Sequence, residues 1–385
     1  MDILFFIFGI VLGILSGLLP GLHSNTIIAI ISNLGFSNDQ LAFIIIALMP
    51  AHILVSYIPS IFFGIPDQNT VVSILPGQRL VLKGKGLLAL KVVLLSSLIA
   101  ILLSIAFFYF SLNFFEAVYS FLRDYVKYIV LVLAVLFISK SKNVPFAIAI
   151  FIIAGLLGYS SFNLKMNDPF LPLFSGMFAM AAFFNYSKTT LPKQKDITIN
   201  DFGFIKYSFL GVILGIFSDI LPGISSASQV AILLTIFMNL ETVEYLAAIS
   251  SITVSQAIFT LATSAAIGKS RMGTTAMLAN VFDIKNNLFL LVVAFLISAA
   301  VVSAIVYLIR KRVGNLAGID FSKFNLLLAI YLVAIVFILD GFVGLAILTL
   351  ASLLGYATIK LDIERTNLMG AIIIPTLLLL FRIFI

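Results

Sequence analysis

The chain repeats itself, and this duplication restricts its fold more than any other feature of the sequence. Three blocks recur in the same order, at offsets of 202, 204 and 197 residues. The paired blocks are Gly9, Gly13, Pro20 and Gly21 with Gly211, Gly215, Pro222 and Gly223; Gly64 and Thr70 with Gly268 and Thr274; and Leu156-Leu157-Gly158-Tyr159 with Leu353-Leu354-Gly355-Tyr356. A duplication of this kind predicts two copies of one structural unit.

The composition places both copies in a lipid bilayer. Hydrophobic residues make up 62% of the chain and charged residues 10%, against about 45–50% and about 25% in soluble domains. We therefore predict an all-α polytopic membrane protein. The chain has no cysteine, which excludes thiol catalysis and disulfides. Its net charge of +7 lies in predicted loops, so it indicates membrane topology, and we expect no nucleic-acid partner.

Each half offers five segments of roughly the 20 apolar residues that a spanning helix needs. We predict about ten transmembrane helices, at residues 41–63, 87–111, 126–139, 145–160, 169–186, 243–267, 287–309, 324–339, 341–358 and 368–385. Because five is odd, the second copy should insert upside down relative to the first. The predicted organisation is a first repeat at 1–187, a cytoplasmic linker at 188–206 and a second, inverted-topology repeat at 207–385.

Both repeats begin with an apolar segment that is interrupted in its middle. Pro20-Gly21 cuts residues 3–34, and Pro222-Gly223 cuts residues 207–238. Proline removes a backbone donor and obstructs the preceding helical turn, so we predict two re-entrant helical hairpins. Further half-helices are expected at 70–76 and 274–282.

The basic residues predict the orientation, since Lys and Arg prefer cytoplasmic loops. With the N-terminus outside, all but seven of the 23 Lys and Arg residues face the cytoplasm. The seven on the other side are Arg123, Lys127, Lys165, Lys269, Arg271, Lys285 and Arg382. We therefore predict a multi-pass protein of the cell (plasma) membrane.

The hairpin tips are the predicted substrate site. A broken helix exposes free N–H groups, and the helix dipole adds partial positive charge at an N-terminus, so an anion suits this place. The candidate substrate-binding residues are Pro20, Gly21, Ser24, Asn25 and Thr26 in the first hairpin and Pro222, Gly223, Ser225, Ser226, Ser228 and Gln229 in the second. The alternative is that these side chains cap their own helices.

Three further residues complete the candidate site. Asp219 lies in an apolar run three residues before Pro222. A carboxylate in a membrane helix is costly and usually functional, so Asp219 could take a coupling Na⁺ or H⁺; the alternative is a local structural partner. Asn69 and Arg271 lie in polar breaks that are equivalent in the two halves. They are candidate substrate ligands; the alternative is that both breaks are solvated loops. No catalytic or metal-binding constellation stands out, and no cofactor beyond the coupling ion is expected.

A set of motifs resembles the large membrane subunit of tripartite tricarboxylate transporters, the TctA permease, in its shorter archaeal-type branch. The motifs are Gly13-x3-Gly17-x2-Pro20-Gly21-Leu22, Pro76-Gly77-Gln78-Arg79-Leu80, Lys83-Gly84-Lys85-Gly86, Leu221-Pro222-Gly223-Ile224-Ser225, Gly268-Lys269-Ser270-Arg271-Met272-Gly273 and Arg365-Thr366-Asn367-Leu368-Met369-Gly370. The resemblance implies secondary uptake of carboxylates driven by a proton or sodium gradient. It also implies a small membrane subunit and an extracytoplasmic binding protein as partners; a homodimer is left open.

The favoured function is therefore a permease for a small organic anion, a di- or tricarboxylate, with alternating access at the paired Pro-Gly hairpins. A translocase of a polyprenyl-phosphate lipid carrier is the first alternative. The hairpin at Pro222-Gly223-Ile224-Ser225 resembles that of such carriers, and a lipid phosphate would use the same helix ends. The second alternative is a membrane enzyme or scaffold that transports nothing.

Overall fold

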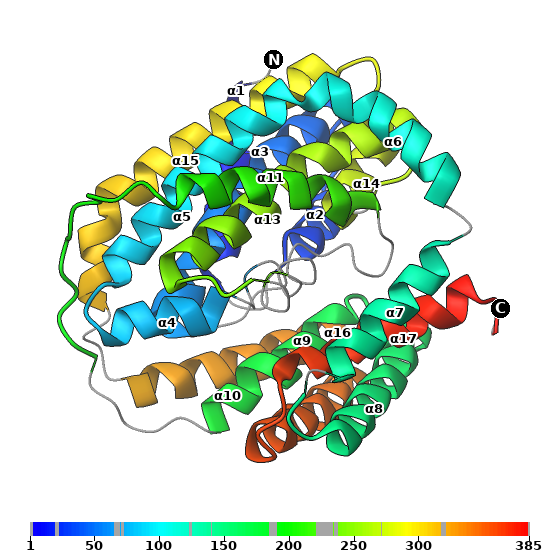
Figure 1. Ribbon diagram of the computed structural model, residues 1–385. Coiled ribbons are helices and arrows are strands. Elements are labelled where there is room, and N and C mark those ends of the chain that lie inside the picture. The colour runs from blue at the N-terminus through cyan, green and yellow to red at the C-terminus, as the bar shows by residue number, and fades with distance from the viewer. Residues whose placement is uncertain are drawn as a thin grey trace. The chain divides into compact units, whose positions relative to one another are not determined.

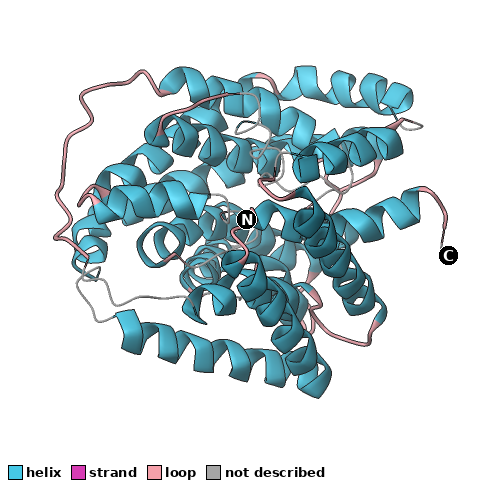
Figure 2. Ribbon diagram, turned by 60° about the horizontal axis from the view of Figure 1, so that its bottom comes forward, coloured by secondary structure: helices cyan, strands magenta, loops and turns pink. Residues whose placement is uncertain are grey.

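The computed structural model describes residues 3–19, 23–64, 70, 73–122, 125–139, 141–184, 191–220, 234, 238–270, 272–316 and 321–383. These residues form helices and loops and contain no strand, as Figure 2 shows, so the predicted all-helical class is confirmed. The longer helices are α1 (Ile3–Leu18), α3 (Asn38–Phe63), α5 (Gly86–Ala106), α6 (Phe108–Leu122), α7 (Val126–Ser139), α8 (Val144–Asn163), α11 (Ile205–Ile220), α13 (Thr242–Ile267), α15 (Leu288–Leu316), α16 (Phe321–Lys360) and α17 (Gly370–Leu380).

Shorter helical segments lie between them (Figure 1). They are α2 (Ser24–Ile31), α4 (Ile74–Leu82), α9 (Phe170–Phe174), the π-helical Ser175–Met180, α10 (Ala181–Phe184), α14 (Gly273–Val281) and the 3₁₀ segment Arg365–Met369. The predicted half-helix at 274–282 corresponds to α14. The one at 70–76 instead begins at Ile74 and continues to Leu82, since Pro76 in its first turn needs no backbone donor.

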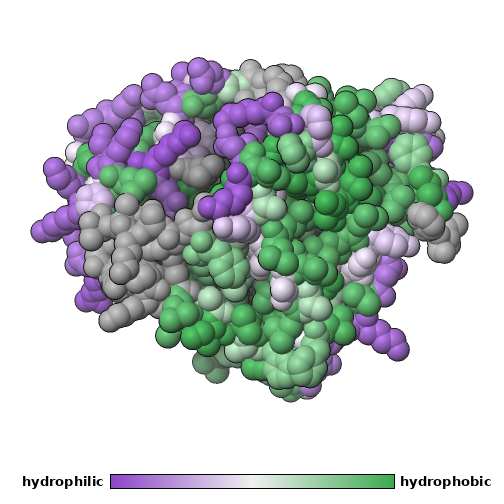
Figure 3. All heavy atoms as spheres, turned by 90° about the horizontal axis from the view of Figure 1, so that it is seen from below, coloured by the Kyte–Doolittle hydropathy of each residue, from purple (hydrophilic) through white to green (hydrophobic). Residues whose placement is uncertain are grey.

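Six helices of the described part are long and apolar enough to cross a membrane: α3, α5, α8, α13, α15 and α16. Figure 3 shows hydrophobic side chains over a broad area of one face, which suits contact with lipid. The predicted total of about ten spans is not confirmed, because the segments at 126–139, 169–186 and 368–385 form shorter helices. The span predicted at 87–111 ends at Ala106, and α6 begins at Phe108. Helix α16 carries a break at Gly341, the first residue of the second of the two spans predicted there.

The helices gather in two compact units, and each unit draws helices from both halves of the sequence. Unit 1 contains α1–α6, α11, α13–α15 and the linker from Leu191; unit 2 contains α7–α10, α16 and α17. A cut between the predicted repeats would therefore divide both units. The repeat boundaries and the opposite insertion of the copies remain predictions.

Helices α3 and α13 show how the duplicated sequence builds the same element twice. Each has 26 residues, and each begins with a capping box: Ser37 with Gln40 in α3, and Glu241 with Glu244 in α13. Each ends at a glycine in the left-handed region, where a side chain would be strained; φ is +66° at Gly64 and +65° at its repeat partner, Gly268.

The same glycines then pack equivalent helix pairs in unit 1. A Cβ added at Gly9 would lie 2.4 Å from the Ile44 carbonyl oxygen, and one added at Gly211 would lie 2.6 Å from the Ala248 oxygen. Ile44 and Ala248, like the two glycines, are equivalent positions of the repeat. Helix α1 therefore packs on α3 in the register that α11 uses on α13. Close backbone approach at small residues is the usual way in which helices associate in a membrane.

Within unit 1, helices of the two halves of the sequence also pack against each other. Ser298 Oγ in α15 donates to the Ala47 oxygen in α3 at 2.6 Å, and Ser251 Oγ in α13 donates to the Ser96 oxygen in α5 at 3.2 Å. Ser96 and Ser298 are repeat equivalents, and so are Ala47 and Ser251. Each half therefore places its long central helix against a helix of the other half.

In unit 2, helices of the two halves also pack against each other, here at the glycines Gly158 and Gly355. A Cβ added at Gly158 in α8 would lie 1.9 Å from the Ala371 oxygen in α17. One added at Gly355 in α16 would lie 2.2 Å from the Met177 oxygen, in the π-helical segment. Again a helix of one half rests on a helix of the other, with no room for a methyl group.

We predict that Gly158→Ala and Gly355→Ala each destabilise the protein, by about 1–3 kcal/mol, because the methyl group would have to displace a backbone carbonyl. Thermal unfolding of the purified protein in detergent measures this as a lower Tm. Ala149→Val, which adds bulk to an exposed position of α8, is the matched control and should leave the Tm unchanged. Equal Tm values for all three variants would contradict the close packing.

Candidate functional site

Helix α2 presents its N-terminal turn at the place predicted for substrate. Ser24, Asn25 and Thr26 form its first turn, and His23 holds the N-cap position without a side-chain bond to the helix start. The three candidates are therefore helical residues, and the N-cap itself is His23. The first turn contains no acidic residue, so the partial positive charge of the helix end is not offset there.

A second helix start meets this turn. The side chain of Asn25 lies against Gly273, the first residue of α14, where an added Cβ would be 2.6 Å from Asn25 Nδ2. The first turn of α14 also contains no acidic residue. Two helix N-termini, separated by about 250 residues of sequence, therefore lie side by side in unit 1.

Polar oxygen atoms at this junction are buried without a described partner. Thr274 and Thr275, in the first turn of α14, are 2% and 0% exposed. Among the residues that the structure describes, neither Thr Oγ1 atom nor Asn25 Oδ1 has a hydrogen-bond partner. A buried polar atom left unsatisfied is costly. Hydroxyl groups beside two positive helix ends are suited to bind an anion such as a carboxylate.

The other half shows part of the equivalent arrangement before α4. Ser60 and Ser73 share a hydrogen bond at 3.0 Å, and Ser73 Oγ donates to the Thr70 oxygen at 2.6 Å. Thr70 is the repeat partner of Thr274, and its buried Oγ1 also has no partner among the described residues. The sequence equivalent to α2, residues 226–233, lies outside the described residues.

Asp219 lies in the last turn of α11 and is fully buried. Thr263 of α13 donates a hydrogen bond from Oγ1 to Asp219 Oδ2. In the first half the equivalent position is Gly17, which packs on the His52 carbonyl. A buried carboxylate that accepts a hydrogen bond from a hydroxyl group can take up a proton or a cation.

The first half carries its own titratable group beside the equivalent helix contact. His52 Nδ1 lies 2.9 Å from Ser16 Oγ, which also donates to the Gly13 oxygen at 3.0 Å. In the second half Ser218 Oγ makes the matching bond to Gly215, at 2.8 Å. Position 256, which is equivalent to His52, is a glutamine. The two copies therefore share the helix packing but differ in the titratable side chain beside it.

Many of the predicted site residues lie outside the described residues and remain predictions. They are Pro20, Gly21, Asn69, Pro222, Gly223, Ser225, Ser226, Ser228, Gln229 and Arg271. Lys269, beside Arg271, donates to the Tyr119 hydroxyl at 2.6 Å and lies over its ring. Among the described residues no group of three His, Asp or Glu residues gathers to hold a metal ion.

The place of α14 at this junction could not be predicted from the sequence. Thr274 and Thr275 start a predicted half-helix, and hydroxyl residues at a helix start were the signal used at the hairpin tips. What the pattern could not reveal is that α14 meets α2, since this contact joins the two halves.

The described fold defines a polytopic helical membrane protein, and the comparisons give its family. The model of the tripartite tricarboxylate transporter TctA family matches residues 3–370, so the chain belongs to that family, and the predicted resemblance is confirmed. Its motifs thus identify a transporter-type membrane protein, whose family implies membrane and binding-protein partners.

A curated relative matches along nearly the whole chain. It is the uncharacterized protein MJ1079 of Methanocaldococcus jannaschii, which is 28% identical over 401 aligned residues, covering 99% of this chain and 100% of the relative. No solved structure matches the chain.

We predict that Gly273→Ala weakens anion uptake, since its methyl group would push Asn25 off the start of α14. The expected change is about a tenfold higher half-saturation concentration, comparable to one lost hydrogen bond to a charged group. Uptake of labelled di- and tricarboxylates into proteoliposomes measures it. Ala279→Val, on an exposed position of the same helix, is the control; equal effects of both variants would contradict the role of the junction.

Proposed function

We propose that this protein is a secondary transporter for a small organic anion, a di- or tricarboxylate. The observation that carries the proposal is the meeting of α2 and α14 at Asn25 and Gly273, where two helix N-termini lie beside the buried hydroxyl groups of Thr274 and Thr275. Transporters commonly bind anionic groups at the N-termini of discontinuous helices at the repeat interface. Membership in the TctA family supports the same substrate class.

In this proposal each half contributes one hairpin tip to the bound anion. Ser24, Asn25 and Thr26 act with α14, while Ser225, Ser226, Ser228 and Gln229 act from the second hairpin. Asn69 and Arg271 complete the lining, and the Pro20-Gly21 and Pro222-Gly223 breaks keep the helix ends open. The two hairpins would alternate in giving access to the two sides of the plasma membrane, with the N-terminus outside.

Asp219 is the proposed coupling residue. It is buried, and Thr263 holds one of its carboxylate oxygens. Burial of an ionised carboxylate is costly, so the group gains most by taking up Na⁺ or H⁺. We propose that this uptake links the ion gradient to the binding of the anion. A small membrane subunit and an extracytoplasmic binding protein would deliver the substrate, as the family implies.

One described feature favours the lipid-phosphate alternative. An apolar groove of about 410 Å³ runs along α16 in unit 2, lined by Ala329, Ile330, Val333, Ala334, Phe337 and Leu345. Such a groove could accommodate a polyprenyl chain. A translocase of this kind would move the lipid across the bilayer and would not accumulate a water-soluble anion.

A proteoliposome assay separates these functions. We predict gradient-dependent uptake of labelled di- or tricarboxylates and no movement of a fluorescent polyprenyl phosphate. Asp219→Asn should abolish the dependence on the ion gradient while the Tm stays close to the wild-type value. Asp201→Asn, which alters an exposed carboxylate, should transport as the wild type does.

Two results would count against the proposal. Gradient-dependent movement of the lipid without carboxylate uptake would favour the translocase. Unchanged gradient dependence in Asp219→Asn would remove this residue from coupling.

A further inference from the structure

The linker between the two halves is docked on unit 1 along its described course. Gln194 Oε1 accepts a hydrogen bond from the Gly86 N–H at 2.8 Å, and Gln194 Nε2 donates to the Val81 oxygen at 3.0 Å. The Lys195 N–H donates to the Gly84 oxygen at 2.9 Å. These bonds place residues 193–195 on the turn between α4 and α5.

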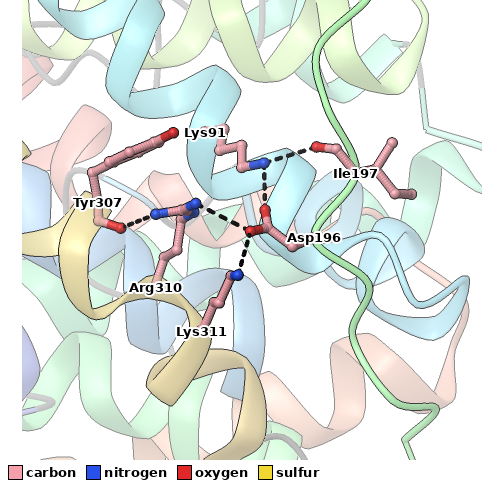
Figure 4. Close-up of polar contacts among 6 residues, drawn as sticks. All are labelled: Lys91, Asp196, Ile197, Tyr307, Arg310 and Lys311. Atoms are coloured by element: carbon pink, nitrogen blue, oxygen red, sulfur yellow. Dashed lines mark hydrogen bonds and ion pairs between the residues drawn. The ribbon is translucent and has the colours of Figure 1, made fainter.

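One carboxylate of the linker, that of Asp196, pairs with three basic side chains (Figure 4). Lys91 of α5 contacts its Oδ1, while Arg310 and Lys311 of α15 lie 3.1 and 3.6 Å from its Oδ2. The hydrogen bond from Lys91 holds the pKa of Asp196 below its ordinary value, with Arg310 adding to the effect. The carboxylate therefore stays ionised at neutral pH and joins α5, α15 and the linker.

Around this docked linker lies a set of exposed basic residues that form no ion pair with any acid in the described part of the chain. We call it the basic surface; it consists of Arg79, Lys83, Lys85, Lys193, Lys195 and Arg312. None of the six makes an ion pair with an acid of the described residues. They come from the α4 end, the α4–α5 turn, the linker and the end of α15. Gly314 of α15 lies against Leu87 of α5, which brings these ends together.

Apolar side chains adjoin the basic surface. Leu82, Tyr307 and Leu308 are 56%, 47% and 76% exposed. Leu82 stands beside Lys83, and the other two lie within about one turn of Lys311 and Arg312. Two candidate spans, α5 and α15, have one end here. A border of exposed apolar and aromatic residues beside basic ones is typical of the level of lipid headgroups.

We propose that the basic surface binds the headgroups of anionic phospholipids. Basic clusters directly beside a membrane span attract anionic lipid, and no acid among the described residues pairs with any of the six charges here. An acidic soluble partner would explain the charges but not the exposed Leu82, Tyr307 and Leu308 beside them. Asp196 contributes by holding Lys193 and Lys195 next to Lys83 and Lys85.

The test uses the full chain released from detergent and examined by native mass spectrometry with added phosphatidylglycerol or phosphatidylcholine. We expect the wild type to retain more phosphatidylglycerol. The triple variant Lys83→Gln, Lys85→Gln, Lys195→Gln should weaken this binding about tenfold or more. The same three positions changed to Arg should keep the preference, which shows that charge and not fold is responsible.

The matched control removes three charges elsewhere, by Lys165→Gln, Lys285→Gln and Lys360→Gln, all exposed. It should keep the preference for phosphatidylglycerol. A wild type that binds both lipids equally, or a control that loses binding as the triple variant does, would overturn the proposal. So would a polyglutamate peptide that binds at the basic surface and is not displaced by phosphatidylglycerol.

Discussion

Close approach of helix backbones at glycines is the constraint on which the described structure depends. Within a bilayer the hydrophobic effect does not drive helices together, so van der Waals packing and hydrogen bonds between helices must do so. Gly9 and Gly211 allow α1 and α11 to rest on the carbonyl groups of α3 and α13, and Gly158 and Gly355 do the same in unit 2. Because these glycines recur in both halves, at offsets of 202 and 197 residues, the duplicated sequence encodes duplicated packing.

The packing of helices from the two halves against each other creates the candidate site. Helix α2 belongs to the first half and α14 to the second, yet their first turns meet at Asn25 and Gly273. One helix end alone would attract an anion only through its own dipole. Where the two ends meet, both dipoles and the buried hydroxyl groups can act on the same anion. The titratable residues beside the α1–α3 and α11–α13 contacts are His52 in the first half and Asp219 in the second. The equivalent positions hold Gln256 and Gly17, so each copy places a different titratable group on the same packing.

Local signals in the sequence were good predictors, and signals that depend on the meeting of distant segments were not. The helical class, the long helices that include α3 and α13, and the short α14 follow from apolar runs, caps and glycines. The end of α5 at Ala106 could not be predicted, because the apolar run continues into α6 through Phe107 and Phe108. Ser24 and Asn25 are candidates from the sequence because they follow a Pro-Gly break. Thr274 and Thr275 were not, since only the fold reveals that α14 starts beside α2.

Cysteine cross-linking tests the central claim most directly, since the chain has no native cysteine. The double variant Asn25→Cys with Gly273→Cys should form a disulfide on mild oxidation in membranes, and a bound carboxylate should slow its formation. Ala47→Cys with Ser298→Cys, across the α3–α15 hydrogen bond, provides the reference pair. Efficient cross-linking of the reference with none between positions 25 and 273 would show that the two helix ends do not meet.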